Sequence, residues 1–231
     1  MDIDLQNKCD TLDYDYIETI VIRKNITFDQ VLQYACYSPI MPLVEYIITR
    51  KKDINWNEVM FFACLSNNNE LIEMLLPRIT NHYEIFNKLC YIGNMTMVMR
   101  FTDIYLHKLN INHGMIEACV HGHTDIINFL LEKHANDYMK SLQILSRYGH
   151  LELSKQMLIR TFTLPIDTEY ADILRSYSVL EACRYGHVRI FNMFVDNSIL
   201  FDIKKASVMA KKGNHVEIYE TIQFLIKSEN V

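Results

Sequence analysis

The sequence predicts an all-α protein assembled from repeated helix-turn-helix units, and three observations support this fold class. A short step, in which alanine and cysteine are followed by glycine and histidine, occurs at Ala118–His123 and again at Ala182–His187. Weaker copies of this step return along the chain at a nearly constant interval. Each copy is followed by apolar residues at the spacing of one helical face. Together these features indicate stacked repeats rather than a single catalytic cavity.

The repeat interval is 26 to 29 residues in six of the seven steps between successive turn positions. A fixed period of this size is typical of solenoid proteins, in which each unit packs on its neighbours. Glycine occupies the turn position in the later repeats and other residues occupy it in the earlier ones. The predicted turn positions are Asp13, Pro39, Asn67, Gly93, Gly122, Gly149, Gly186 and Gly213.

The first helix of each unit ends at the turn. In the clearest unit, Met115, Ala118 and Cys119 lie at i, i+3 and i+4, which predicts a short helix that buries one face. The small alanine and cysteine would let a neighbouring helix approach closely. Gly122 then ends the helix, because a left-handed backbone carries little penalty only where there is no Cβ.

The second helix of each unit follows the turn directly. Thr124 and Asp125 are suited to starting it, and Lys133 and His134 lie at its end, where the helix dipole favours cations. Similar apolar stripes are expected at residues 17–22, 43–48, 71–76, 97–101, 126–131, 153–158, 190–195 and 216–224. The last stripe begins one or two positions late, as an irregular capping repeat would.

One interval is longer than the others. Gly149 and Gly186 are 37 residues apart, and the additional residues lie around Thr161–Thr168. Pro165 disfavours helix before it, whereas Asp167 or Thr168 could cap a helix that runs through Leu174. The segment is therefore expected to form a long loop or an extra helical turn within one stack, with a break between two stacks as the alternative.

The units at Ala118–Asn136 and Ala182–Val195 resemble the ankyrin-repeat family, and their short, cysteine-bearing form is similar to the ankyrin families of giant DNA viruses. The family period is about 33 residues, and its Thr-Pro-Leu-His entry is replaced here by His113–Ile116. The resemblance therefore implies an ankyrin-type solenoid with short or missing hairpin loops. The expected organisation is an N-terminal capping half-repeat at 1–30, repeats at 31–160, a longer insert at 161–178, and repeats with a cap at 179–231.

Composition disfavours two classes of partner. The formal net charge is -5, which opposes nucleic-acid binding. No apolar run reaches the roughly 18 to 20 residues that cross a bilayer, and the acidic start of the chain does not resemble a signal peptide. We therefore expect a soluble, cytoplasmic protein in a reducing compartment, in the host cytoplasm if the protein is viral.

The cysteines and histidines suggest structure rather than chemistry. Stacked repeats would hold Cys36, Cys64, Cys90, Cys119 and Cys183 on helices about 10 Å apart, whereas a disulfide needs Cα atoms within about 7 Å. The recurrence of His123, His150 and His187 beside the turn favours a hydrogen bond across repeats over a zinc site. We expect no metal, no cofactor and no catalytic residue, because no nucleophile motif, phosphate loop or dinucleotide fingerprint is present.

The residues just before each turn would point away from the core, and in ankyrin arrays this edge lines the concave groove. The early pairs are apolar or aromatic and the last ones are basic, and Arg and Tyr are enriched in binding hot spots. An acidic or aromatic-bearing peptide is the expected ligand; a solvated helix end is the alternative. The candidate partner-binding residues are Tyr37, Leu65, Tyr91, His121, Arg147, Tyr148, Arg184, Tyr185, Lys211 and Lys212.

The predicted function is that of a monomeric, non-catalytic scaffold that binds an unidentified host or viral protein. A structural or assembly component without a dedicated groove is the alternative, because repeat stacks with apolar ends can polymerise.

Overall fold

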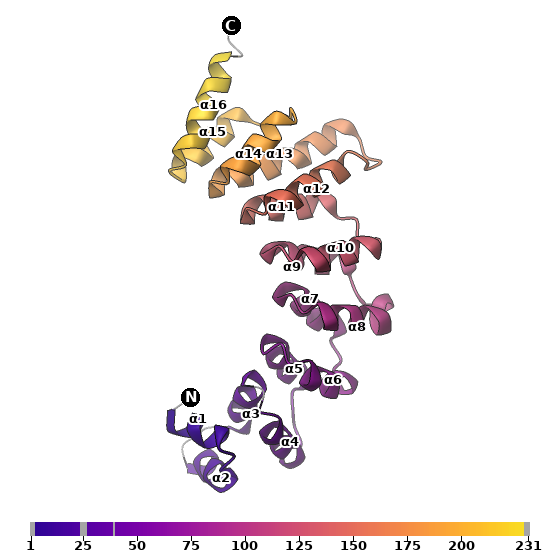
Figure 1. Cartoon of the computed structure of the whole chain (residues 1–231), viewed down its shortest axis with the longest axis vertical. Coiled ribbons are helices and arrows are strands. Elements are labelled where there is room, and N and C mark those ends of the chain that lie inside the picture. The colour runs from indigo at the N-terminus through magenta and orange to yellow at the C-terminus, as the bar shows by residue number, and fades with distance from the viewer. Residues whose placement is uncertain (1–2, 24–26, 39, 229–231) are drawn as a thin grey trace. The chain divides into compact units, whose positions relative to one another are not determined.

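The computed structural model of the chain describes residues 3–23, 27–38 and 40–228, and the regular structure of these residues is entirely helical (Figure 1). The all-α prediction is therefore confirmed. The chain divides into two compact units, Met1–Asn110 and Ile111–Val231.

The N-terminal unit contains short helices joined in pairs. Their bounds are α1 Ile3–Asp10, α2 Tyr14–Arg23, α3 Phe28–Tyr37, α4 Met41–Arg50, α5 Trp56–Leu65, α6 Asn69–Leu75, α7 His82–Ile92 and α8 Met95–Tyr105, with 3-10 turns η1 Leu76–Arg78 and η2 Leu106–Lys108.

The C-terminal unit continues the same alternation. Its helices are α9 Ile111–His121, α10 Thr124–Glu132, α11 Tyr138–Tyr148, α12 Leu151–Thr161, α13 Thr168–Tyr185, α14 Val188–Asp196, α15 Ile203–Lys212 and α16 Val216–Ser228.

Within each unit the helices form two layers. Each odd-numbered helix packs on the even-numbered helix that follows it, and successive odd-numbered helices also pack on one another, as α3, α5 and α7 do in the first unit and α9, α11, α13 and α15 in the second. The even-numbered helices of the second unit contact each other more sparsely, through the pairs α12–α14 and α14–α16. The odd-numbered helices, called first helices below, are thus the continuous layer.

The small residues of the repeated step lie at the centre of this packing. Cys36, Cys64, Cys119 and Cys183 are fully buried, and so are the alanines immediately before them. All six cysteines are free thiols. The prediction that these residues are small buried hydrophobes is confirmed.

The turn positions are mostly as predicted. Gly93, Gly122, Gly149 and Gly186 have positive φ angles between 69° and 85°, and Asn67 adopts the same left-handed region at 54°. Pro39 lies outside the described residues, as do the side chains of residues 20–22 from the first predicted stripe.

Two turn positions were predicted one residue away from where they occur. Leu12, not Asp13, has the positive φ, and Asp13 instead accepts a hydrogen bond from the backbone N–H of Tyr16 at the start of α2. This shift places Cys9, three residues before Leu12, in register with the other buried cysteines. At the other end of the chain Asn214, not Gly213, is left-handed.

The left-handed turn at Asn214, in place of Gly213, changes the register of the last repeat. The N–H of His215 bonds the carbonyl of Ala210 just as that of His187 bonds Ala182, so Lys212 corresponds to Arg184. Lys211 then corresponds to Cys183 but is exposed. The cysteine position faces the next first helix, as the contact of Cys119 with Ser141 shows, and no further first helix follows α15 among the described residues. Lys211 therefore belongs to a polar capping face and not to the predicted edge.

Helix α10 begins at Thr124, as predicted, but Thr124 is its first helical residue and not its N-cap. The N-cap residues of α10, α12 and α14 are His123, His150 and His187, and none of them caps its helix through its side chain. The Thr124 hydroxyl bonds the carbonyl of Gly122 instead.

Asparagine side chains organise the links between repeats, where a hairpin would otherwise be expected. Asn57 on α5 accepts hydrogen bonds from the backbone N–H groups of Thr80 and Asn81, and Asn112 on α9 does the same for Asn136 and Asp137. The described residues contain no strand, so these side-chain bonds satisfy backbone donors that a β-hairpin would pair.

The long interval is accommodated by lengthening one helix. Asp167 caps α13 through the N–H of Tyr170, as predicted, but the helix runs on past Leu174 to Tyr185 without interruption. Helix α11 packs on α13, so the stack of first helices continues across the insert rather than breaking there. The boundary between the two units lies at Asn110 instead.

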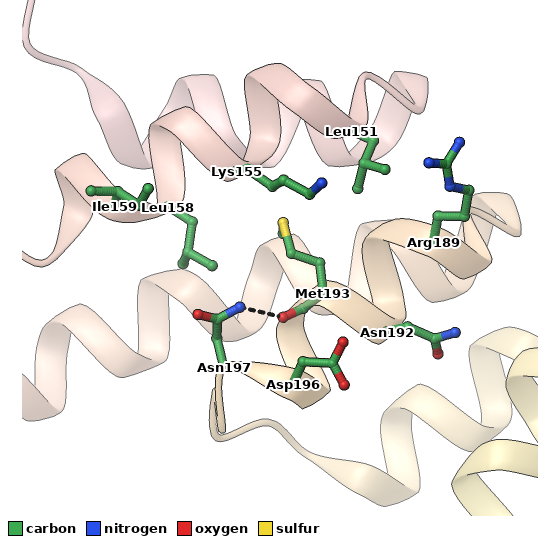
Figure 2. Close-up of a pocket in the computed structure, with 9 residues that line it drawn as sticks. All are labelled: Leu151, Lys155, Leu158, Ile159, Arg189, Asn192, Met193, Asp196 and Asn197. Carbon is green, nitrogen blue, oxygen red and sulfur yellow. Dashed lines mark hydrogen bonds between the residues drawn. The ribbon is translucent and has the colours of Figure 1, made fainter.

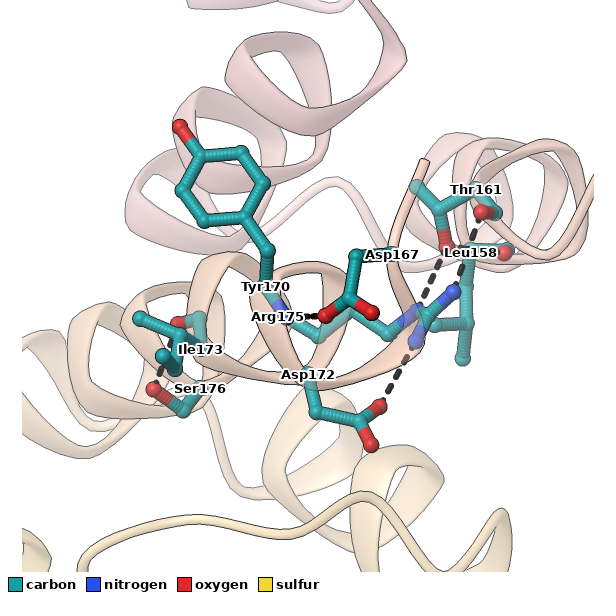
Figure 3. A network of polar contacts seen from close by, with 8 residues as sticks. All are labelled: Leu158, Thr161, Asp167, Tyr170, Asp172, Ile173, Arg175 and Ser176. Atoms are coloured by element: carbon teal, nitrogen blue, oxygen red, sulfur yellow. Dashed lines mark hydrogen bonds and ion pairs between the residues drawn. The ribbon is translucent and has the colours of Figure 1, made fainter. Parts of the chain in front are cut away.

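A buried arginine anchors the lengthened helix (Figure 3). Arg175 is 5% exposed, and its guanidinium donates to the hydroxyl and carbonyl oxygens of Thr161, each at 3.0 Å, and to Asp172 at 2.7 Å. Its guanidinium carbon also lies 4.3 Å from the centre of the Phe162 ring. The end of α12 and the first turns of α13 are thereby tied together.

Candidate partner-binding surface

The candidate surface is the edge of the first helices next to the turns, and a ladder of histidines holds that edge in the C-terminal unit. The Nε2 atoms of His150, His187 and His215 lie 3.1, 2.8 and 2.9 Å from the carbonyl oxygens of Val120, Arg147 and Arg184 in the preceding repeat. The predicted histidine bond across repeats is therefore confirmed for His150 and His187. His215 was missed because the turn before it was placed one residue early.

Each histidine ring packs where the preceding turn glycine has no side chain. A Cβ added to Gly122, Gly149 or Gly186 would come within 2.4 to 2.8 Å of the next repeat's imidazole ring, which is closer than real contacts allow. Glycine is thus required twice at these turns, for its left-handed backbone and for the space it leaves.

In the N-terminal unit the predicted edge is largely apolar. Tyr37 is 61% exposed and Leu65 is 37% exposed, each at the end of its first helix. Tyr91 is half-buried, and the Lys88 ammonium lies 4.9 Å from its ring centre and 4.7 Å from that of Phe61. Lys88 and Phe61 were not predicted as site residues, since they lie one turn of helix before the positions considered.

In the C-terminal unit His121, Tyr148 and Tyr185 are exposed as predicted, but Arg147 is half-buried and paired with a carboxylate of the protein. Its Nε donates to Glu181 at 2.9 Å, and this hydrogen bond raises the pKa of the guanidinium. Its guanidinium carbon lies 5.8 Å from the centre of the Tyr185 ring. Arg147 is therefore a structural cation more than a free contact for a ligand.

Glu181 was not predicted to contribute to this edge, yet it links two of the predicted residues, Arg147 and Arg184. Its side chain is 9% exposed and also lies 3.8 Å from a terminal nitrogen of Arg184. A nearly buried carboxylate between two guanidiniums is well compensated, because each arginine is a permanent cation.

A basic pocket lies beside Arg184, between α13 and α15. It encloses about 550 Å³, and every charged side chain in its lining is a cation. Val208 and Met209 supply apolar surface. The pocket is lined by Arg184, Lys204, Lys205, Val208, Met209, Lys212 and Gly213.

Two predicted residues, Arg184 and Lys212, meet in this pocket, whereas Lys211 does not line it. Lys204 was missed although it shares a helical face with Val208 and Lys212 through the i, i+4, i+8 spacing, which could have revealed it. Lys205 is paired with Asp202 at 3.2 Å, whereas Lys204 and Lys212 have no carboxylate within ion-pair distance among the described residues. These two lysines are the cations most available to a ligand.

Another hollow lies on the second-helix layer of the same unit, between α12 and α14 (Figure 2). It encloses about 520 Å³, with the nearly buried Leu158 and Met193 in its lining together with Lys155, Arg189 and Asp196. Lys155 is paired with Glu152 at 2.9 Å, and the Asn197 amide bonds the carbonyl of Met193. The mixed charge of this hollow gives it no preference for a ligand of either sign.

The remaining reactive residue types are structural. Burial raises the pKa of the Cys36, Cys64, Cys119 and Cys183 thiols to about 12, which suppresses the nucleophilic thiolate. Over the described residues no group of three or more His, Cys, Asp or Glu side chains could hold a metal ion.

None of the models of protein families matches this chain, and none of the curated proteins does. Among the described helices, none combines the length with the apolar character that a membrane-spanning helix requires.

Proposed function

We propose that this chain is a non-catalytic binding protein of the ankyrin-repeat type and that it binds an acidic segment of a protein partner, of host or viral origin, in the cytoplasm. The observation that carries the proposal is the pocket between α13 and α15, whose charged lining is entirely cationic although the whole chain is negative. A local field of this sign selects ligands by charge and orients them as they approach.

The composition of the pocket favours a peptide over a small anion. Val208 is 52% exposed and lies with Met209 between the lysines, so a ligand gains most by presenting an apolar side chain flanked by carboxylates. The rigid packing of α15 on α13, through the fully buried Ala206 and Ala210, supports binding with little reorganisation.

Peptide display on the full-length chain tests the proposal. From a random library, we expect enrichment of peptides with Asp or Glu around a large apolar residue. The double variant Lys204→Glu, Lys212→Glu should bind these peptides at least about tenfold more weakly, because two attractive contacts become repulsive. Arg147 is left unchanged, since a glutamate there would face Glu181 and disturb the fold.

The matched control is Lys155→Glu with Arg189→Glu, the same reversal at the hollow between α12 and α14. This control should leave binding unchanged, with circular dichroism confirming that both double variants are folded. Equal losses in the two variants, undiminished binding in the Lys204, Lys212 variant, or no acidic enrichment with the native chain would each overturn the proposal.

A further inference from the structure

The first turns of α13 form an exposed ridge that the neighbouring first helices lack. Helix α13 has 18 residues, against 11 in α11 and 10 in α15. Tyr170, Ile173 and Tyr177 are spaced at i, i+3 and i+7 on it and are 56%, 46% and 51% exposed. The Arg175 network holds this ridge in place, and Figure 3 shows Tyr170 and Ile173 projecting from the helix near Arg175.

A third hollow borders this ridge, and its charge is opposite to that of the basic pocket. It encloses about 480 Å³ between the start of α13 and the segment that leads into α15. Its charged lining residues are Glu169, Asp172 and Asp202, and Ile173, Leu200 and Phe201 provide apolar surface. Leu200 is 71% exposed.

The basic pocket and this acidic hollow are neighbours along α13 and α15, and together they are called the α13–α15 groove below. Lys205 lines the basic pocket and Asp202 lines the acidic hollow, and the ion pair between them, at 3.2 Å, joins the two. Glu169 and Arg184 lie at opposite ends of the same continuous helix, which at 1.5 Å per residue separates them by about 22 Å. The groove is thus acidic at the start of α13, apolar along its course and basic at the end of α13.

We infer that this groove binds an amphipathic helix of the protein partner in one direction only, with an acidic first third, an apolar middle and a basic last third. This inference rests on the proposed function and adds the form and the polarity of the ligand. About 15 helical residues would span the groove. A helix is stabilised by acidic residues at its own start and basic residues at its end, so the preferred ligand runs antiparallel to α13.

Two synthetic peptides of about 15 residues test this inference on the full-length chain. One has glutamates in its first third, leucines along one face of its middle and lysines in its last third. The other has the same composition with the two charged thirds exchanged. By fluorescence anisotropy, we expect the first peptide to bind at least about tenfold more tightly, because only it opposes unlike charges at both ends of the groove.

Reducing the charge at both ends of the groove should reduce the preference. The double variant Glu169→Lys, Lys212→Glu places one cation at the acidic end and one carboxylate at the basic end, where Arg184, Lys204 and Lys205 remain. It should therefore weaken the native preference for the first peptide, whereas the control variant Lys155→Glu, Arg189→Glu should keep that preference. Equal binding of the two peptides by the native chain, or an unchanged preference in the double variant, would overturn the inference. Either outcome would leave the proposed function intact as long as binding of acidic peptides still requires Lys204 and Lys212. The inference about the form and direction of the ligand would then fail alone.

Discussion

The two units differ in the side chain that follows the repeat turn and in what that side chain bonds. In the N-terminal unit Asn68 and Asn94 follow the turn, and each caps its own second helix. Asn94 also donates to Asn69 of the preceding repeat at 2.8 Å. In the C-terminal unit histidines occupy this position, cap nothing and reach the preceding repeat's backbone carbonyls instead.

The difference follows from side-chain length and from the turn residue. An asparagine is short enough to fold back onto its own helix, whereas an imidazole extends over the neighbouring turn and needs a glycine there to make room. The C-terminal unit therefore depends on its glycines more strongly, and it gains inter-repeat hydrogen bonds to the carbonyls of Arg147 and Arg184, of which Arg184 lines the basic pocket.

Gly186→Ala should have the largest effect on this comparison. The left-handed backbone alone costs about 1–2 kcal/mol for a residue with a Cβ, and displacement of the His215 ring should bring the loss of unfolding free energy to about 3 kcal/mol. Urea unfolding measures this loss of unfolding free energy, and hydrogen exchange should show faster exchange in the C-terminal unit.

The control for this prediction is Asn67→Ala in the N-terminal unit, where a side chain already occupies the left-handed turn. It should cost only about 1 kcal/mol. In addition, His215→Ala should relieve part of the penalty of Gly186→Ala. Equal losses at the two turns would show that the imidazole does not impose the glycine.

Asn94→Ala should have an intermediate effect, about 2 kcal/mol, because a nearly buried residue loses both a helix cap and an inter-repeat bond. Asn68→Ala should cost about 1 kcal/mol, because Asn68 caps its helix and, among the described residues, its amide otherwise reaches only the Met41 sulfur, at 3.8 Å. Thermal and urea unfolding measure both values. A smaller loss for Asn94 than for Asn68 would contradict the inter-repeat role.

Ser146→Cys should have the smallest effect on the free energy of unfolding, and it should stabilise the protein where the preceding variants destabilise it. Ser146 occupies in α11 the position that cysteine holds in α3, α5, α7, α9 and α13, and its fully buried hydroxyl has no hydrogen-bond partner among the residues that the structure describes. Replacing an unsatisfied hydroxyl by a thiol should add about 1 kcal/mol of stability. Ser176→Cys, at a hydroxyl that bonds the carbonyl of Ile173, is the control and should add nothing. Destabilisation by Ser146→Cys would show that the hydroxyl is satisfied in solution.

The exposed edges of the two units also differ, and the sequence anticipated the direction of this difference. The aromatic character of Tyr37 and Tyr91 and the basic character of Arg184 and Lys212 were evident from their place before the turn. Lys211 was placed wrongly because the last turn moved from Gly213 to Asn214, and one residue on a helix rotates a side chain by about 100°. Glycine is the usual residue at a left-handed turn, which favoured Gly213 in the prediction. In the structure Gly213 has a right-handed helical backbone, with φ of -79°, and Asn214 makes the turn.

By itself the sequence determined the helical class, the repeat period, the buried cysteines and the histidine bonds, because all of these follow from local periodicity repeated in register. Only the tertiary structure decided which charges are available. Arg147 is neutralised by Glu181, 34 residues away, whereas Lys204 and Lys212, beside Arg184, have no carboxylate partner in the described part of the chain. Such pairings depend on how closely two first helices pack and how far each side chain reaches, and the spacing of residues along one helix specifies neither.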